Sequence, residues 1–404
     1  MKILHIIDIA YEAGGAEKVI KTLRDSIQQR GHEVFVLATD QNAAGKEIFA
    51  DALIPVVRGG PLTRLCKFLW NHDAYRTVRA IIRDFKPDIV QMNTIGAFSP
   101  AILWGIGSTP AIQMIHGPTE YTLELLPYTL PASDYHHGSY QWDDIRLIGR
   151  LRYAHLRYLQ RPAYLLAMRR IKLVVAPSKF IARATAVDFP RTPIVHIYPG
   201  IVLPGKLPLP DSFRPTVLCA GRMEAVKGVD HLIKAFAHVH RGFPETVLRI
   251  VGDGSHRKEL ESLAVQLGLS DCVEFAGWVR QKQLYREYAT ATLLAIPSVW
   301  PEALGLVAVE AMATGRPIVG SNTGGIPELI DDHVTGIIVE PRDELGLASA
   351  IGGLLADRDR LVNAANASAV KALDFDRDAF ADKILDLYQR VLDQHAPASV
   401  RVHP

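Results

Sequence analysis

Short apolar runs alternate with segments of helical periodicity along most of the chain. In the first half the apolar runs lie at residues 2–7, 33–38, 88–91, 111–115, 173–176 and 194–197. In the second half they lie at residues 216–220, 247–251, 273–275, 293–296, 318–320 and 337–339. Strands of this length joined by helices are typical of βαβ units, in which the strands are parallel. The pattern therefore predicts an α/β fold whose ligands bind at the C-terminal edges of parallel sheets.

A stretch with five prolines and no periodic pattern, at residues 199–215, separates the two halves. Because 404 residues exceed what one hydrophobic core usually organises, we predict two domains, at residues 1–198 and 216–374, joined by this linker. Residues 375–404 add a helical segment and a tail. The alternation breaks at residues 118–170, which form an irregular, basic and tyrosine-rich segment.

The composition changes this picture little. With 48% hydrophobic and 22% charged residues, the sequence is typical of a globular protein, and its net charge of +2 gives no sign of a nucleic-acid partner. Its three cysteines lack the spacing of a metal site and are interpreted as free thiols in a reducing compartment. We find no signal peptide and no run of 18 apolar residues, and we expect a cytoplasmic protein.

Two glutamates mark a loop that runs into a helix at residues 297–315. Glu302 and Glu310 stand eight residues apart, and only apolar and small residues separate them. We predict a helix from about Leu304 to Thr314, ended by Gly315. An ionisable group on such an apolar helix needs a polar partner, and a ligand hydroxyl is one candidate. The free N–H groups at the helix N-terminus favour an anion.

Two cations follow the first predicted strand of the second half. Arg222 and Lys227 are flanked by Gly221 and Gly228, an arrangement that suits a phosphate. The alternative is a pair of solvated surface charges. The Gly252–Gly254 turn lacks the third glycine of a nucleotide-binding loop and is interpreted as structural. The glycines at 324 and 325 either turn the chain or face a ligand.

The first half carries a weaker set of candidate residues. Gly14 and Gly15 follow the first predicted strand, where backbone can approach a ligand closely. They lack the spacing of a dinucleotide-binding motif. His116 follows a later strand at the same predicted sheet edge, which leaves a functional and a structural interpretation open.

Arginines gather on one side of a predicted helix within the irregular segment, at positions 146, 150, 157 and 161. Such a segment binds an anionic membrane surface or guides a charged acceptor. The alternative is an amphipathic helix that packs on the first domain and leaves its arginines in solvent.

The order of these motifs resembles that of the retaining glycosyltransferases of family GT4, which have the GT-B fold of two Rossmann-like domains facing across a cleft. The resemblance is strongest at residues 216–341, fair over residues 1–117 and weak at 118–170. It rests on Gly14-Gly15-Ala-Glu17, His116-Gly117, Gly221-Arg222, Lys227-Gly228, Gly252-Asp-Gly254, Gly277-Trp-Val279, Glu302 to Glu310, and Gly324-Gly325-Ile-Pro-Glu328. In this fold the C-terminal helix crosses back to the N-terminal domain.

The resemblance implies a role for each candidate residue. Glu302 would bind hydroxyls of the transferred sugar, Glu310 the ribose hydroxyls, and His116 the reacting sugar. Arg222 and Lys227 would hold the diphosphate. The remaining contacts would come from backbone: to the diphosphate from Leu304, Gly305 and Leu306, to the base near Val279, and to the phosphate or acceptor from Gly14 and Gly15.

The implied activity is the transfer of a hexose-type sugar, with retention, from a UDP- or GDP-linked donor to a saccharide or lipid-linked saccharide. We expect no metal and no other cofactor, because two cations and a helix N-terminus can stabilise the departing diphosphate. Residues 118–170 point to the inner face of the cytoplasmic membrane. The alternatives are a glycoside phosphorylase or a sugar-nucleotide epimerase of the same fold, and a non-catalytic protein that binds nucleotide sugars.

Overall fold

The computed structural model describes residues 1–56, 70–117, 123, 126–130, 145–210 and 214–395. The chain divides into two compact units. The first holds the described residues up to Ile201, except Ile145, and takes up the chain again at Arg377. The second holds residues from Val202 to Asp376 together with Ile145. Apart from Ile145, the chain passes to the second unit after Ile201, inside the predicted linker at 199–215, and it returns after Asp376, close to the predicted boundary at 374.

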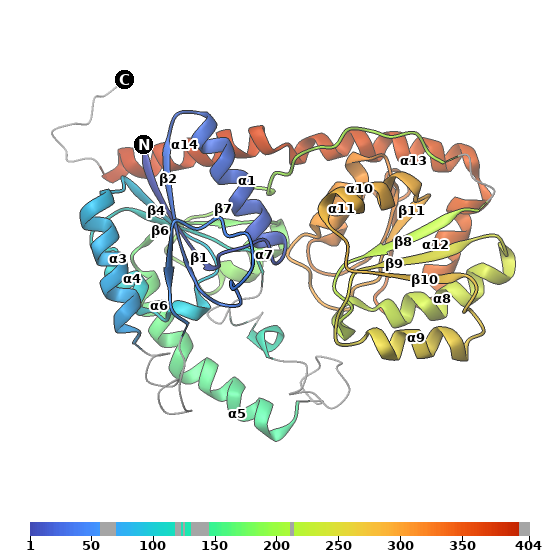
Figure 1. Cartoon of the computed structure of the whole chain (residues 1–404), viewed down its shortest axis with the longest axis horizontal. Helices are drawn as coiled ribbons and strands as arrows, with labels where there is room; N and C mark the ends of the chain where they lie inside the picture. The colour runs from blue at the N-terminus through green and yellow to red at the C-terminus, as the bar shows by residue number, and fades with distance from the viewer. Residues whose placement is uncertain (57–69, 118–122, 124–125, 131–144, 211–213, 396–404) are drawn as a thin grey trace. The chain divides into compact units, whose positions relative to one another are not determined.

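The first unit is built on a parallel sheet with the strand order β3-β2-β1-β4-β5-β6-β7 (Figure 1). The order reverses at β1, which pairs with β2 on one side and β4 on the other. In such a sheet, ligands bind beyond the C-terminal ends of the strands next to the reversal. The strands are β1 (Lys2–Ile9), β2 (Glu33–Thr39), β3 (Ala52–Ile54), β4 (Ile89–Met92), β5 (Ala111–Met114), β6 (Ile171–Ala176) and β7 (Ile194–His196).

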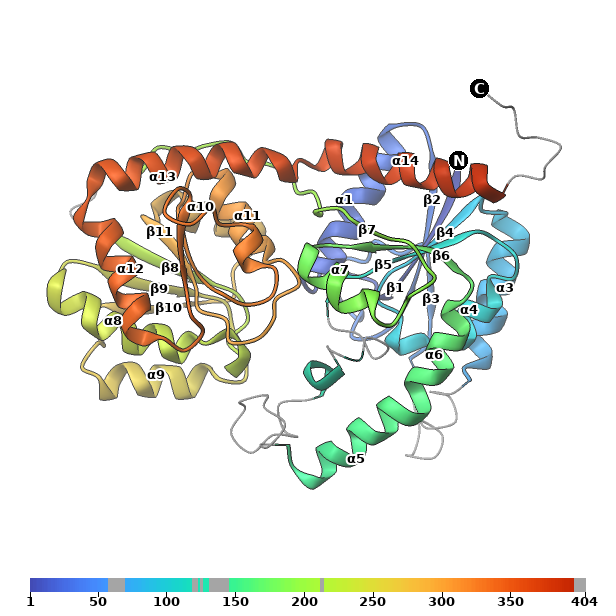
Figure 2. The same cartoon turned by 180° about the vertical axis from the view of Figure 1, so that it is seen from behind.

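Helices cover this sheet and extend from it. The sheet-facing side of α1 buries Val19, Ile20, Leu23 and Ile27, at the three- and four-residue spacing of an amphipathic helix. By contrast, α5 projects from the body of the unit in both views (Figures 1 and 2). The helices are α1 (Gly15–Gln29), α3 (His72–Phe85), α4 (Ala101–Gly105), α5 (Leu147–His155), α6 (Arg161–Met168), α7 (Lys179–Ala186) and α14 (Arg377–His395), with the short turns η1 (Gly96–Phe98) and η2 (Leu126–Thr129) and a π-helical turn, η5 (Leu156–Gln160).

The C-terminal helix α14 belongs to the first unit, where it packs against α1 (Figure 2). The guanidinium of Arg30, at the end of α1, donates from Nε to Asp382 Oδ1 at 2.7 Å and from Nη1 to Asp378 Oδ1 at 3.2 Å. At the return point, the Arg377 amide donates to the carbonyl of Ile201 at 3.1 Å. The two positions at which the chain changes unit are thus joined by a hydrogen bond.

The second unit repeats the same topology with one strand fewer. Its parallel sheet has the order β10-β9-β8-β11-β12-β13, so the reversal falls at β8, between β9 and β11. The strands are β8 (Thr216–Ala220), β9 (Val247–Val251), β10 (Val273–Gly277), β11 (Leu293–Ile296), β12 (Ile318–Ser321) and β13 (Gly336–Val339). The helices are α8 (Val229–Gly242), α9 (Arg257–Gln266), α10 (Gln281–Thr290), α11 (Leu306–Ala313), α12 (Glu344–Ala356) and α13 (Arg358–Lys371), with the short turns η6 (Ala225–Lys227), η7 (Ile326–Glu328) and η8 (Ala372–Phe375).

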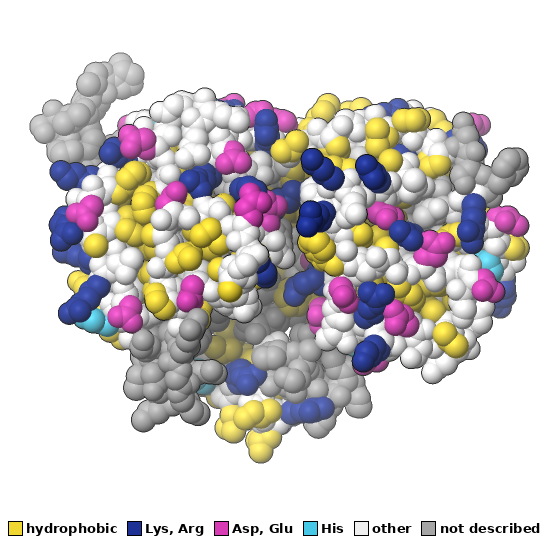
Figure 3. Space-filling view, viewed as in Figure 1, with side chains coloured by type: hydrophobic (Ala, Val, Ile, Leu, Met, Phe, Trp, Pro, Cys, Tyr) yellow, Lys and Arg dark blue, Asp and Glu magenta, His cyan; other side chains and the backbone are white. Residues whose placement is uncertain are grey.

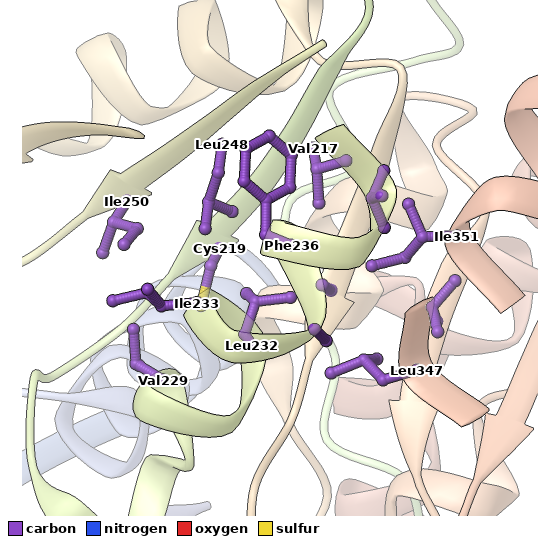
Figure 4. Close-up of a cluster of buried hydrophobic side chains, with 14 of the residues drawn as sticks. Val217, Cys219, Val229, Leu232, Ile233, Phe236, Leu248, Ile250, Leu347 and Ile351 are labelled. Carbon is purple, nitrogen blue, oxygen red and sulfur yellow. The ribbon is translucent and has the colours of Figure 1, made fainter. Parts of the chain in front are cut away.

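One hydrophobic core lies between the sheet of the second unit and the helices α8 and α12 (Figure 4). Val217 and Leu248 come from the strands, Leu232 and Phe236 from α8, and Ile351 from α12. All are buried, and each such side chain stabilises the unit by about 1.5–3 kcal/mol. This core holds in place the sheet whose C-terminal strand ends lead into the loops of the candidate site.

Of the thirteen strands in the described part of the chain, the apolar pattern identified twelve, with ends that differ by two residues at most. The strand it missed is β3, which has three residues and lies at the edge of its sheet. So short an edge strand has too few buried positions to leave a pattern. Among the described residues, none of the helices has both the length and the apolar character needed to cross a bilayer.

Candidate functional site

An ion pair lies where the strand order of the second unit reverses. Lys227 ends the turn after β8, and Glu302 lies in the loop after β11. Lys227 Nζ is 2.5 Å from Glu302 Oε1, and the hydroxyl of Ser298 donates to the same oxygen at 2.7 Å. The Glu302 side chain is 13% exposed and that of Lys227 is 23% exposed. The structure therefore brings together two of the residues singled out in the sequence, 75 positions apart.

Glu302 stays ionised at neutral pH. Burial by itself would raise the pKa of its carboxyl group. The positive charges of Lys227 and Arg222 and the hydrogen bonds from Lys227 and Ser298 outweigh that effect, and the pKa is lowered below its usual range. Glu302 is therefore an acceptor of hydrogen bonds, with one oxygen already engaged by Lys227 and Ser298.

Glycines let the loops of this site approach one another closely. Gly324 has a φ of 59°, and a Cβ there would lie 2.4 Å from the Glu302 nitrogen. The amide of the next residue, Gly325, donates to the Glu302 carbonyl at 2.8 Å. Gly228 has a φ of 63°, and a Cβ there would lie 2.1 Å from the Pro297 carbonyl. The glycine pair at 324–325 therefore turns the chain and also fixes the backbone of Glu302.

The Gly252–Gly254 turn supports the loop that carries Arg222. A Cβ on Gly252 would lie 1.8 Å from the Gly221 carbonyl, and one on Gly254 would lie 2.4 Å from the Met223 carbonyl. The Met223 amide donates to the Asp253 carbonyl at 2.9 Å. This close backbone packing agrees with the structural interpretation of the G-x-G sequence.

Arg222 itself is exposed. Among the residues that the structure describes, its guanidinium forms no ion pair, although its charge contributes to lowering the pKa of Glu302. Five donors in a planar fork are thus presented to solvent at the sheet edge. Such a group can receive an anionic ligand without first giving up a protein partner.

Glu310 is held by residues that the sequence did not reveal. Its side chain is buried in α11, where Tyr288 Oη donates to Oε2 at 2.9 Å and Gln281 Nε2 donates to Oε1 at 3.3 Å. Burial, and next the charge of Glu310, raise the pKa of the Tyr288 phenol, so Tyr288 remains a donor. The polar partner expected for Glu310 is therefore supplied, at least in part, by α10. Nothing in the spacing of Gln281 and Tyr288 could have indicated this.

The helix after Glu302 begins later than predicted. It starts at Leu306, with Gly305 before it at a φ of 103°, instead of at Leu304. Leu304 therefore lies in the loop before α11, and it is buried. Val279 lies between β10 and α10 and is half-buried, whereas the neighbouring Trp278 is 71% exposed. Trp278 belongs to the Gly277-Trp-Val279 motif but was assigned no role from the sequence.

The remaining predicted residues lie at the C-terminal edge of the sheet in the first unit. Gly14 and Gly15 begin α1 after β1. Gly14 has extended backbone, a conformation that any residue adopts. His116 follows β5, and its Nε2 is 3.1 Å from Asn93 Oδ1. Burial lowers the pKa of His116 to about 4, so the ring is neutral at pH 7.

Free thiols and metal ligands were also considered in the sequence. Cys219 and Cys272 are free and buried, and burial raises the pKa of Cys219 to about 12, which makes it an unreactive core thiol. Cys66 lies outside the described residues. Within the part of the chain that the structure describes, there is no cluster of three or more His, Cys, Asp or Glu side chains suited to a metal ion.

Family models match both halves of the chain. The model described as Glycosyltransferase Family 4 matches residues 13–203, and the model described as Glycosyl transferases group 1 matches residues 208–370. Together they leave only the two ends and a short gap unmatched.

Curated relatives match part of the chain. A GDP-mannose-dependent alpha-(1-6)-phosphatidylinositol monomannoside mannosyltransferase of Mycolicibacterium smegmatis is 33% identical over 216 residues, which are 48% of this chain and 56% of the relative. A D-inositol 3-phosphate glycosyltransferase of Xylanimonas cellulosilytica is 37% identical over 179 residues, 43% of this chain and 42% of the relative. The matched segment thus spans about half the length of these relatives.

Solved structures match nearly the whole chain. Sucrose-phosphate synthase from Thermosynechococcus elongatus is similar with a TM-score of 0.73 and 21% identity, covering 96% of this chain and 98% of that one. HepE of Anabaena, in complex with UDP and glucose, has a TM-score of 0.70 and 20% identity, covering 96% and 100%. These likenesses show the fold, which is the GT-B fold. The two family models, which together span most of the chain, show the family: the chain belongs to the glycosyltransferases of family 4, and its second half is a group 1 glycosyltransferase domain.

Proposed function

We propose that the chain is a retaining glycosyltransferase that transfers a hexose-type sugar from a UDP- or GDP-linked donor to a saccharide or lipid-linked saccharide. The observation that carries this proposal is the Lys227–Glu302 pair beside the exposed Arg222, at the reversal of the strand order. Two cations and an ionised carboxylate at this position suit a ligand with an anionic half and a hydroxylated half.

The cations would stabilise the leaving diphosphate. When the bond from the anomeric carbon to the β-phosphate oxygen breaks, negative charge grows on the phosphate and positive charge grows on the sugar ring. Lys227 has three N–H donors and uses one for Glu302, so it can bind the phosphate without losing its position. Arg222 would add a bidentate contact, and the backbone of Leu304, Gly305 and Leu306 would donate N–H groups at the start of α11.

The two glutamates would divide the recognition of the donor. Glu302 accepts hydrogen bonds from hydroxyls of the transferred sugar, which its lowered pKa supports because the carboxylate stays ionised. Glu310, held by Tyr288 and Gln281, binds the ribose hydroxyls. The base would lie against the backbone near Val279. As the family resemblance implies, Gly14 and Gly15 would contact the phosphate or the acceptor, and His116 would contact the reacting sugar.

Retention would follow from a displacement on one face of the sugar. The acceptor oxygen forms its bond to the anomeric carbon as the bond to the diphosphate breaks, and a phosphate oxygen takes the acceptor proton. The products are the glycoside and a nucleoside diphosphate. This step needs neither a carboxylate nucleophile nor a metal ion, and we propose that the reaction uses neither.

Thermal-shift measurements with UDP, GDP, ADP and their sugars would test the donor, because a ligand that binds the folded state raises its melting temperature. We expect a UDP or GDP compound to stabilise the protein, followed by nucleoside diphosphate release when a saccharide acceptor is added. No stabilisation by any of them would contradict the proposal. Release of sugar 1-phosphate with inorganic phosphate would identify a phosphorylase, and isomerisation without an acceptor an epimerase.

The surface of α5 supports an acceptor at an anionic membrane face. Leu147, Ile148 and Leu151 are exposed, with Leu147 at 75%, and they fall within an arc of about 100° on an ideal helix. Arg150 and Arg152 lie on the two sides of this arc. Figure 3 shows hydrophobic side chains with basic side chains beside them at the lower edge, where Figure 1 draws α5.

An apolar stripe between arginines matches the chemistry of an anionic membrane surface, with acyl chains below and phosphate groups above. The continuation of the helix also exposes Tyr158, Leu159 and Leu166. Arg161, one of the four arginines expected on one side of the predicted helix, pairs with Asp188, whose side chain is buried. Part of the basic segment, at residues 118–122, 124–125 and 131–144, lies outside the described residues.

Co-sedimentation with anionic phospholipid vesicles would test this surface. We expect binding at low salt that is weakened by salt and abolished by the double change Leu147→Asp and Leu151→Asp. Val187→Asp is the matched control, because Val187 is equally exposed, at 74%, on another part of the first unit. Protein that stays in the supernatant at low salt would contradict a membrane-bound acceptor.

A further inference from the structure

A chain of buried polar side chains runs through the first unit from the C-terminal helix to His116. Its members are His5 on β1, Tyr388 on α14, Gln91 on β4 and Asn93 just beyond β4. All four are at most 1% exposed. Buried polar groups are costly unless they are hydrogen-bonded, and here they bond mainly to one another. So long a polar chain in the middle of a parallel sheet calls for a reason other than packing.

The donor and the acceptor of each hydrogen bond in this chain can be assigned, beginning with the hydroxyl of Tyr388. Its hydroxyl donates to Gln91 Oε1 at 2.5 Å, so the same oxygen can only accept from His5 Nε2, which lies at 3.1 Å. Burial raises the pKa of Tyr388 well above its usual value, which keeps the phenol a donor. Because Gln91 accepts at Oε1, its amide nitrogen faces the other way and donates to Asn93 Oδ1 at 2.9 Å.

Asn93 determines which ring nitrogen of His116 carries the proton. Its Nδ2 donates to the carbonyl of Ile6 at 3.1 Å, which fixes the orientation of the amide and leaves Oδ1 as an acceptor. His116 Nε2 lies 3.1 Å from Oδ1 and must therefore carry the proton of that hydrogen bond. Since the ring is neutral, Nδ1 carries the lone pair, and it makes no hydrogen bond to any residue that the structure describes.

We propose that Tyr388, Gln91 and Asn93 are positioning residues that hold His116 in the neutral Nε2–H tautomer, so that Nδ1 accepts a hydrogen bond from a hydroxyl of the transferred sugar. The identity of that hydroxyl rests on the proposed function; the tautomer does not. The C-terminal helix thereby acts on the predicted sugar site, which it does not itself form.

The tautomer matters because the sugar ring gains positive charge as the diphosphate leaves. A protonated imidazole would place a second positive charge beside it and oppose the reaction. A hydroxyl that donates to Nδ1 keeps its own oxygen electron-rich, which stabilises the developing charge. A chain of neutral amides and a phenol can impose this state, whereas a buried carboxylate in place of Asn93 would favour the protonated ring.

Nitrogen-15 NMR of the unliganded protein, labelled in its histidine rings, tests the tautomer without any substrate. The signals of His116 are assigned by their loss in His116→Ala. We expect Nε2 to be protonated and Nδ1 to be unprotonated at pH 7. A protonated Nδ1, whether in the other tautomer or in the cation, would overturn the proposal whatever the activity of the enzyme.

Tyr388→Phe then tests whether α14 sets this state. The change removes the hydroxyl that donates to Gln91 and accepts from His5, and with it the constraint that Gln91 places on the Asn93 amide. We therefore expect a mixture of His116 tautomers, with kcat lowered about two- to tenfold, the size of one lost hydrogen bond, and the donor KM unchanged. Tyr164→Phe is the matched control, because Tyr164 is also fully buried in the first unit and its hydroxyl bonds the main-chain carbonyl of Ile95 instead. It should leave both the tautomer and kcat unchanged.

The two measurements separate the proposal from the proposed function. An unchanged tautomer in folded Tyr388→Phe would show that the chain does not set the histidine. A second outcome would be that the wild type and Tyr388→Phe show the expected tautomers while His116→Ala keeps full activity. The chain would then set the tautomer, but the proposed contact between Nδ1 and the sugar would be wrong.

Discussion

The two units share one topology and differ in the chemistry at their binding edges. In both, a parallel sheet reverses its strand order at the first strand of the unit. At the reversal in the second unit lie charges that remain partly open to solvent: Arg222 and the Lys227–Glu302 pair. In the first unit lie neutral groups with buried partners: His116, Asn93 and the chain that leads to Tyr388.

Under the proposed function, this difference reflects what each edge would stabilise. A diphosphate brings two or more negative charges, so the cations that bind it must be available and still positioned, which pairing Lys227 with Glu302 achieves. A sugar ring is neutral before reaction and positive during it, so a neutral acceptor serves it better than a cation. The same backbone topology thus accommodates either chemistry, because the binding groups come from loops and strand ends.

The largest expected effect comes from removing a cation at the charged edge. Lys227→Ala should lower kcat/KM by about 2–4 kcal/mol of transition-state stabilisation, because it removes a phosphate contact and leaves Glu302 without its counter-charge. Steady-state kinetics with the matched donor would measure this. Lys234→Ala is the control: Lys234 pairs with Glu344 on the outside of the same unit and should retain full activity. Equal losses in both variants would contradict a specific role for Lys227.

Next come the two glutamates, whose replacement should separate binding from turnover. Glu310→Ala should weaken nucleoside diphosphate binding by about 1–3 kcal/mol, the cost of losing hydrogen bonds to a charged group. Glu302→Ala should mainly lower kcat and leave nucleoside diphosphate affinity nearly unchanged. Calorimetric titration with the nucleoside diphosphate and kinetics on the same preparations would decide. The same loss of affinity in both variants would rule out this division.

As the pH is lowered, the buried histidines of the first unit should destabilise the fold at a higher pH than Glu302 of the second unit does. Burial, Arg24 and His116 lower the pKa of His5 to about 3, and burial lowers that of His116 to about 4. The unfolded chain therefore binds more protons than the folded one from about pH 6.5 downward. As the pH decreases below this value, the free energy of unfolding decreases by up to about 1.4 kcal/mol per pH unit for each histidine.

Urea unfolding of the wild type and of His5→Gln at pH 7 and pH 5 measures this effect. We expect the wild type to lose on the order of 1–2 kcal/mol more than the variant over this interval. The lowered pKa of Glu302 acts in a lower range: its contribution is present above the ordinary glutamate pKa and is lost only as the pH falls through the lowered value. A pH-independent difference between wild type and His5→Gln would contradict the account of the neutral edge.

The smallest expected effect is that of a chelator. If Arg222, Lys227 and the start of α11 stabilise the diphosphate without a metal, then EDTA should leave kcat/KM unchanged. The assay compares turnover with EDTA and with added Mg²⁺ or Mn²⁺. A loss of activity that returns with the metal would show that the charged edge is incomplete by itself.

The sequence by itself indicated most of the architecture. Strands buried on both faces of a parallel sheet are short apolar runs, and apolar runs are visible without an alignment. The loops that carry Arg222, Lys227 and Glu302 were found for a related reason: they follow directly on such strands. The glycines at 221, 228, 324 and 325 also pointed to close backbone approach, although not to which backbone they approach.

Only the tertiary structure decided which partners the polar residues have. Lys227 meets Glu302 across 75 positions, and Tyr388 meets Gln91 across 297. Gln281 and Tyr288 reach Glu310 from a separate helix. Apolar periodicity reports which face of an element is buried, because burial depends on local spacing. It cannot report which polar atom meets which, because that is set by the packing of elements distant in sequence and by hydrogen-bond geometry within a few tenths of an ångström.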